Sequence, residues 1–185
     1  MTLKKRILAM VEGALMLAMA TVLGYFRLYR FPFGGSVDLA LVPILVYCLR
    51  WGGKWGTLCA LIYGILEYFL GGGIAISWQS MVLDYVGCNV MTGLCGLGCG
   101  RKGGWLWGPV LAHLGRAAVL VLSGGLLWYM YMPEEFLGLA MVNPWVYSLL
   151  YNGVLSAVVL AVDLAALYLL GRMDLGQQKI LTKQY

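Results

Sequence analysis

Charge is what this sequence has least of. Only 11% of its 185 residues are charged, whereas soluble domains carry about 25%. It also has a single histidine, His113, and no GxxxxGK[ST] segment of the kind that cradles nucleotide phosphates. The scarcity of charge excludes an ordinary soluble domain. The missing phosphate loop excludes transport driven by ATP hydrolysis within this chain.

Signals for metal binding and catalysis are also scarce. The five cysteines are odd in number and lie inside apolar segments, so a disulfide framework is not expected. Cys95 and Cys99 share a helical face, but no nearby histidine or third cysteine completes a metal site. His113 is accompanied by no recognisable nucleophile. We therefore expect no metal, no cofactor and no catalytic residue.

Apolar residues, by contrast, are abundant and make up 62% of the chain. They form recurrent runs, each near the roughly 20 residues that span a bilayer. The length allows about six spans with short loops, so we expect an all-α integral membrane protein, with a single membrane domain over residues 1–185. The expected helices are 6–29, 38–50, 55–70, 77–99, 105–129 and 145–170.

The basic residues predict how these helices are oriented. Ten of the 13 fall on one side of the expected membrane: Lys4, Lys5, Arg6, Arg50, Lys54, Arg101, Lys102, Arg172, Lys179 and Lys183. By the positive-inside rule, both termini are cytoplasmic and the loops 30–37, 71–76 and 130–144 are external. The loop 30–37 is either a mobile lid or a plain turn. The basic residues thus indicate membrane orientation, and nucleic-acid binding is not expected.

Asp84 is the most informative polar residue, in the first third of the expected helix 77–99. A carboxylate at that depth costs roughly 2.5–3.5 kcal/mol on insertion scales, so it usually faces a bundle interior and meets a polar or cationic partner. No Lys or Arg lies within a helical turn of it. We therefore interpret Asp84 as the acceptor for a ligand that arrives from outside.

Further polar and aromatic residues fall in the same outer half of the expected bundle. They are Tyr63, Tyr85, Trp128, Tyr147 and Asn152. An interfacial belt would explain the aromatic residues, but it requires neither a carboxylate nor an amide at this depth. An acidic acceptor, an amide and aromatic faces together suit a small, flat, nitrogen-rich heterocycle, particularly a cationic one.

Three other polar residues have expected structural roles. Asp38 either caps the helix that it begins or lines the mouth of the site. Arg116, in mid-helix, is expected to pair with helix carbonyls or with a carboxylate, either Asp84 or Glu67. Asp163 is expected to form an interhelical bond or to extend its side chain to the interface.

Several segments together carry a resemblance to a known family. They are Ala14-x-x-x-Ala18, GGSVDLALVPIL at 34–45, W-G-x-x-x-A-x-x-Y-G at 55–64, Leu83-Asp84-Tyr85, Ser123-Gly124 followed by Trp128, and NPWVYSLLYNG at 143–153. The chain resembles the thiamine-specific S component, the substrate-binding membrane subunit of energy-coupling factor (ECF) transporters. The resemblance covers nearly the whole chain in length, helix count and order.

The resemblance implies a six-helix bundle that binds thiamine near its outer face, beneath the first external loop. Carried over by position, Asp84 would accept from the aminopyrimidine, Tyr147 and Asn152 would complete the pyrimidine contacts, and Trp128 would stack on the thiazolium ring. Tyr85, Tyr63 and Asp38 would line the pocket.

The resemblance also implies partners and a location. Ala14 and Ala18 would pack against the transmembrane coupling subunit, which works with two cytosolic ATPases in the plasma membrane of a bacterial cell. Leu120 stands where thiamine-binding members have a histidine, so an S component for a related vitamin or precursor, of the aminopyrimidine or pyridoxal type, is an alternative. A membrane enzyme is a weaker alternative, because no cluster of acid–base residues marks a headgroup plane.

Overall fold

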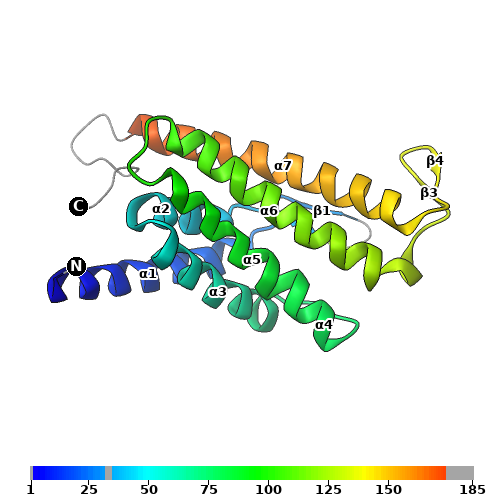
Figure 1. The fold of residues 1–185 in the computed structure, drawn as a ribbon, viewed down its shortest axis with the longest axis horizontal. Helices are drawn as coiled ribbons and strands as arrows, with labels where there is room; N and C mark the ends of the chain where they lie inside the picture. Colours follow the sequence, from blue (N-terminus) through cyan, green and yellow to red (C-terminus); the bar gives the residue numbers. More distant parts are fainter. Residues whose placement is uncertain (1, 32–34, 174–185) are drawn as a thin grey trace.

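The protein is almost entirely helical (Figure 1). The computed structural model describes residues 2–31 and 35–173. Its helices are α1 (Leu3–Leu23), α2 (Leu41–Trp51), α3 (Gly53–Leu70), α4 (Trp78–Met81), the π-helical η1 (Val82–Gly87), α5 (Cys88–Val90), the 3-10 helix η2 (Met91–Gly98), α6 (Gly104–Leu126), the 3-10 turn η3 (Tyr129–Tyr131) and α7 (Pro144–Met173). Helices α4 to η2 follow one another without interruption and form one rod, residues 78–98.

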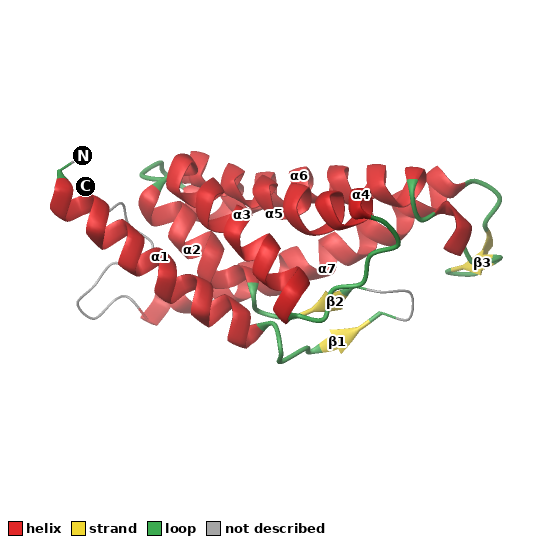
Figure 2. Ribbon diagram, turned by 90° about the horizontal axis from the view of Figure 1, so that it is seen from below, coloured by secondary structure: helices red, strands yellow, loops and turns green. Residues whose placement is uncertain are grey.

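Two short antiparallel hairpins connect the helices. The first pairs β1 (Tyr29–Arg30) with β2 (Ser36–Val37), and the second pairs β3 (Glu135–Phe136) with β4 (Leu139–Ala140). In Figure 2 the first hairpin lies along one side of the helices and the second lies at the far end of α7. The expected loops 30–37 and 130–144 therefore both contain hairpins. Residues 32–34 of the first lie outside the described residues.

Four helices in the described part of the chain are long and apolar enough to cross a membrane. They are α1, the rod 78–98, α6 and α7. Many of their large apolar side chains are exposed, including Leu8, Val11 and Leu15 on α1 and Leu149 on α7. Exposed apolar surface on this scale is typical of a protein that is solvated by lipid. The structure is thus that of a membrane protein.

Helix α2 forms the centre of the core. Nearly all of its residues are buried, and Ile44, Leu45 and Cys48 are completely so. It packs against α1, α3, η2 and α7. Because apolar residues cover every side of α2, it fits the interior of the bundle, while the longer helices around it face outward.

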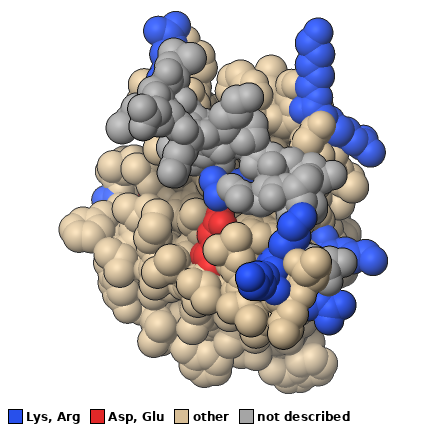
Figure 3. All heavy atoms as spheres, turned by 90° about the vertical axis from the view of Figure 1, so that its left-hand side faces the viewer, with Lys and Arg blue, Asp and Glu red and all other residues tan. Residues whose placement is uncertain are grey.

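Basic side chains gather at the end of the molecule where α1 begins and α7 ends (Figure 3). The chain order accounts for this, since Lys4 and Lys5 begin α1, Lys54 follows the turn between α2 and α3, and Arg172 closes α7. Such a one-sided distribution is typical of the cytoplasmic end of a membrane protein.

The first expected helix, 6–29, was wrong at its carboxyl end. Helix α1 stops at Leu23, and the chain then turns and enters β1. The Tyr25 hydroxyl donates to the Leu70 carbonyl at 2.7 Å, and Arg27 Nη2 donates to the Gly71 carbonyl at 2.6 Å. These bonds draw the chain across the end of α3. Similarly, the expected helix 105–129 ends earlier, with α6 at Leu126.

Helix α3 and η2 approach each other backbone to backbone. A Cβ atom at Gly96 would lie 2.3 Å from the Gly53 nitrogen, and a Cβ atom at Gly93 would lie 2.8 Å from the Thr57 Cα. Backbone atoms cannot move aside as a flexible side chain can. Glycine at these two positions is therefore what allows the helices to pack.

Gly96→Ala is expected to lower the thermal unfolding temperature of the detergent-purified protein, since overpacking typically costs about 1–3 kcal/mol. Leu97→Ala is the matched control, because Leu97 is the next residue and is 48% exposed. An equal unfolding temperature for Gly96→Ala and wild type would contradict the close packing of α3 on η2.

Candidate functional site

Asp84 lies in η1 and contacts the residue that follows α6 by two positions. The Trp128 Nε1–H donates to Asp84 Oδ2 at 2.8 Å, and both side chains are partly buried. Two residues that the sequence assigned to one site are thus brought together from segments 44 residues apart. The carboxylate does have a partner within the protein, contrary to expectation. Because an indole is uncharged, this partner leaves the negative charge of Asp84 uncompensated.

The backbone around Asp84 is irregular. Residues 82–87 form a π-helical stretch instead of continuing α4. Such stretches are rare in proteins and are frequent at functional sites. On the facing helix, the fully buried Ser123 hydroxyl lies near the carboxylate, but no hydrogen bond joins the two. The wall around Asp84 therefore comes from η1 and the last turns of α6.

Asn152 and Ser148 fasten α7 to the same part of α6. Asn152 Nδ2 donates to the Ser148 carbonyl at 3.0 Å and to the Leu120 carbonyl at 3.4 Å. Ser148 Oγ in turn donates to the Val121 carbonyl at 2.9 Å. A Cβ atom at Gly124 would lie 2.2 Å from Ser148 Oγ, so the helices meet here because Gly124 has no side chain. Asn152 on α7 thus bonds to α6, the helix whose last turns lie beside Asp84.

Aromatic rings from both hairpins converge on the first two turns of α7. Tyr147 and Tyr151 lie 5.7 Å apart between ring centroids, as their i, i+4 spacing predicts. Phe136 of β3 lies 5.5 Å from Tyr147 and 5.6 Å from Tyr151, and Phe31 lies 6.1 Å from Tyr151. Tyr147 is therefore part of an aromatic cluster that links α7 to the two hairpins.

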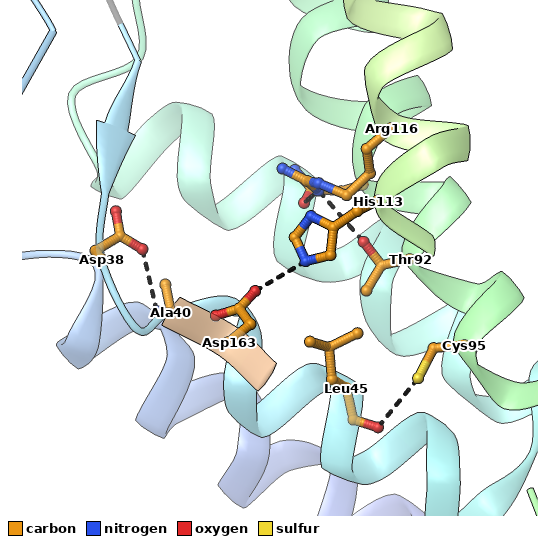
Figure 4. A network of polar contacts seen from close by, with 9 residues as sticks. Asp38, Ala40, Leu45, Thr92, Cys95, His113, Arg116 and Asp163 are labelled. Atoms are coloured by element: carbon orange, nitrogen blue, oxygen red, sulfur yellow. Dashed lines mark hydrogen bonds and ion pairs between the residues drawn. The ribbon is translucent and has the colours of Figure 1, made fainter. Parts of the chain in front are cut away.

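The other three expected pocket residues make contacts elsewhere. The Tyr85 hydroxyl bonds with the backbone of Ile74, accepting at 2.8 Å and donating at 3.2 Å. Asp38 accepts from Ser36 Oγ at 2.9 Å and from the Ala40 amide at 3.0 Å, just before α2 begins (Figure 4). Tyr63 on α3 is 3% exposed and lies within electrostatic range of Glu67 and Arg116. The capping interpretation of Asp38 was wrong, because α2 begins at Leu41, its N-cap is Ala40, and Asp38 bonds within the turn before the helix.

The interior of the bundle holds two polar contacts that include Arg116 and His113 of α6. Arg116 donates to Asn89 and to Thr92, and Asn89 donates to Glu67 Oε2 at 2.6 Å. Arg116 thus reaches Glu67 through an amide, and its hydrogen bonds go to Asn89 and Thr92 instead of to either expected carboxylate. Figure 4 shows Arg116 directed at Thr92, and His113 directed at Asp163.

Asp163 forms the interhelical bond that was one of its two expected roles. His113 Nε2 lies 3.0 Å from Asp163 Oδ2, which joins α6 to α7, and both residues are buried. Within the described residues, no group of three or more His, Cys, Asp or Glu side chains is placed to hold a metal ion. The five cysteines are free thiols.

On α1, Ala14 and Ala18 are both exposed, whereas Ala9, Gly13 and Ala20 face the bundle. The small-residue pattern expected to meet a partner therefore lies on the outer side of the helix, where another helix can approach closely.

A model of a known protein family matches most of this chain. The model described as "Thiamine transporter protein (Thia_YuaJ)" matches residues 10–178. The chain belongs to this family. The match confirms the transport function expected from the sequence, and it places the chain among transporters and not among enzymes.

Individual relatives agree with the family. "Thiamine transporter ThiT" of Bacillus subtilis (strain 168) is 29% identical over 189 residues, covering 91% of this chain and 94% of that protein. The protein of the same name from Lacticaseibacillus paracasei (strain ATCC 334) is 25% identical over 165 residues, covering 80% and 79%. A solved structure of ThiT from Listeria monocytogenes has a TM-score of 0.82 at 18% identity, covering 96% of this chain and 99% of that one, so the fold is shared.

Sequence reasoning gave no site role to three residues that pack near the candidate site: Asn89, Ser123 and Ser148. All three are fully or almost fully buried polar residues within apolar helices. A polar residue in a membrane-spanning segment usually has a specific partner, and this signal was present in the sequence. The partners themselves lie on other helices, so they could not be named.

Gly124→Ala is expected to displace Ser148 and Asn152 and so to weaken ligand binding, because the new methyl group would overlap Ser148 Oγ. Gly153→Ala on α7 is the control, since a Cβ atom at Gly153 would meet nothing within 4 Å. Isothermal titration of both purified variants with thiamine checks this. Equal affinities would show that the α6–α7 contact at Gly124 is independent of the site.

Proposed function

We propose that this chain is the thiamine-binding S component of an ECF transporter, with six membrane helices and both termini on the cytoplasmic side of a bacterial plasma membrane. The observation that carries the proposal is the contact between Asp84 and Trp128 in a member of the thiamine transporter family. It supplies an uncompensated carboxylate and an aromatic face at one place. Thiamine, a flat aminopyrimidine joined to a cationic thiazolium ring, needs both.

Asp84 is suited to accept hydrogen bonds from the ligand while it holds Trp128. Its Oδ2 atom takes the indole N–H, so its Oδ1 atom is the acceptor offered to the aminopyrimidine. A carboxylate accepts such bonds more strongly than a neutral group does. The bond also fixes the Trp128 ring, which can then stack on the thiazolium ring without a further loss of side-chain freedom.

Tyr147 and Asn152 complete the proposed pyrimidine contacts from α7. Asn152 uses its amide nitrogen to bind α6 and α7, so its Oδ1 atom is the group it offers to the ligand. Tyr85, Tyr63 and Asp38 are proposed to shape the pocket through their neighbours. Leu120, in place of the family's histidine, supports the alternative of a related vitamin or precursor of the aminopyrimidine or pyridoxal type.

Uptake is proposed to need partners. Ala14 and Ala18 on the outer side of α1 would dock onto the transmembrane coupling subunit, and two cytosolic ATPases would supply the energy. The S component would bind thiamine from outside and then reorient in the membrane as the coupling subunit responds to ATP.

Asp84→Asn and Trp128→Phe are each expected to weaken thiamine binding by about 10- to 100-fold, because a hydrogen bond to a charged group contributes roughly 1.5–3 kcal/mol. Isothermal titration of the detergent-purified protein measures this. Trp78→Phe is the control, since Trp78 is 71% exposed. A folded wild-type protein that binds pyridoxal or a free aminopyrimidine in preference to thiamine would establish the alternative ligand. Unchanged affinity in Asp84→Asn would remove Asp84 from the site.

Replacing Ala14 and Ala18 together with Trp is expected to abolish thiamine uptake by cells while leaving the affinity of the purified protein unchanged. The bulky rings would prevent close helix approach without touching the pocket. Met19→Trp is the control, because Met19 is 49% exposed but lies on a different side of α1. Normal uptake by the double variant would exclude this face as the docking surface.

A further inference from the structure

A chain of hydrogen bonds leads from the residue after Asp84 into the centre of the bundle. Asn89 Nδ2 donates to the Tyr85 carbonyl at 2.7 Å, at the point where the rod changes from the π-helical η1 to α5. The same amide group donates to Glu67 Oε2 on α3 at 2.6 Å. Its oxygen, Asn89 Oδ1, accepts from Arg116 on α6. One fully buried amide therefore joins three helices.

This amide is well satisfied. An asparagine side chain offers two N–H donors and one carbonyl acceptor, and all three groups are used by Tyr85, Glu67 and Arg116. Arg116 makes a further bond to Thr92 Oγ1 at 3.3 Å, which holds the guanidinium against the rod. A buried amide with its donors and its acceptor all paired favours one arrangement, because a shift would leave one of these groups without a partner.

The backbone beside Asp84 is held from several directions as a result. A Cβ atom at Gly64 would lie 2.4 Å from the Tyr85 oxygen, so the backbone of α3 lies directly against this carbonyl. The Tyr85 hydroxyl is fixed to Ile74 at the other end of the side chain. A π-helical stretch is rare, and these contacts hold its backbone in place.

We propose that Glu67, Asn89 and Arg116 form a positioning network for the ligand site. The network holds the π-helical stretch at Tyr85, and thereby directs the Asp84 carboxylate at Trp128 and at the ligand. These residues act through the backbone and do not touch thiamine. The proposal deepens the proposed function and rests on it for the identity of the ligand.

A second buried polar contact on the same helix provides a matched comparison. His113 lies three residues before Arg116 on α6, and its bond to Asp163 leads to α7 and not to the rod 78–98. Both contacts join helices inside the bundle. Only the network of Asn89 includes a bond to the segment that carries Asp84.

The test is a double-mutant cycle on thiamine affinity. Asn89→Leu is expected to raise the Kd by about tenfold or more, and to add less than about twofold when Asp84→Asn is already present, because both changes remove the same interaction. The double variant His113→Phe with Asp163→Leu is expected to lower the thermal unfolding temperature but to leave the Kd within about twofold. A purely structural role for Asn89 would give independent effects that multiply.

A milder pair of variants covers the case in which Asn89→Leu does not fold. Glu67→Gln keeps an oxygen that accepts from Asn89, whereas Glu67→Leu does not. Glu67→Leu is expected to raise the Kd several-fold, and Glu67→Gln to restore it to within about twofold of wild type. Equal affinities for the two variants, or an Asn89→Leu effect that multiplies fully with Asp84→Asn, would overturn the proposal.

A ligand-free measurement separates failure of this proposal from failure of the proposed function. The fluorescence of Trp128 is obtained by subtracting the spectrum of the same protein with Trp128→Phe added. Its emission maximum is expected to shift in the same direction in Asp84→Asn and in Asn89→Leu, because both changes disturb the bond at Trp128 Nε1. If wild type did not bind thiamine, this shift would still support the network. An unshifted Trp128 signal in Asn89→Leu would overturn it even if thiamine binds.

Discussion

The proposed ligand site depends on the hydrogen bond between Trp128 and Asp84. A carboxylate inside an apolar helix needs a partner, and this one accepts from an uncharged indole, with the Ser123 hydroxyl nearby. Neither group neutralises the charge. The proposed site therefore has an acceptor for a cationic ligand at the level of the last turns of α6. The hairpin that contains β3 and β4 follows directly, and its Phe136 reaches the aromatic cluster on α7.

Helix α6 organises the site because it is fastened on two sides. Toward α7, Gly124 allows close approach and Ser148 bonds to the Val121 carbonyl. Toward the rod 78–98, Arg116 binds Asn89, which in turn holds the Tyr85 carbonyl. Movement of α6 would therefore displace both the segment that carries Asp84 and the first turns of α7. This arrangement links the proposed site to the interior of the bundle.

The sequence predicted the local features better than the long-range ones. Asp84 stood out because a carboxylate is unusual at its depth, Trp128 was assigned to the same site by the family resemblance, and the structure joins them. The end of α1 at Leu23 was missed although its C-cap, Gly24, is a local stop signal; the bonds from Tyr25 and Arg27 to the end of α3, which direct the chain after it, could not be predicted. The π-helical stretch has no sequence signature. The partner of Arg116 was missed because an amide, Asn89, stands between the guanidinium and the carboxylate of Glu67.

The most direct test of the central claim is a crystal structure of the protein with thiamine bound. The account predicts a nitrogen of the aminopyrimidine within about 2.7–3.2 Å of the Asp84 carboxylate and the thiazolium ring stacked on Trp128. A thiamine molecule bound elsewhere, with the Asp84–Trp128 bond intact and distant from the ligand, would contradict it.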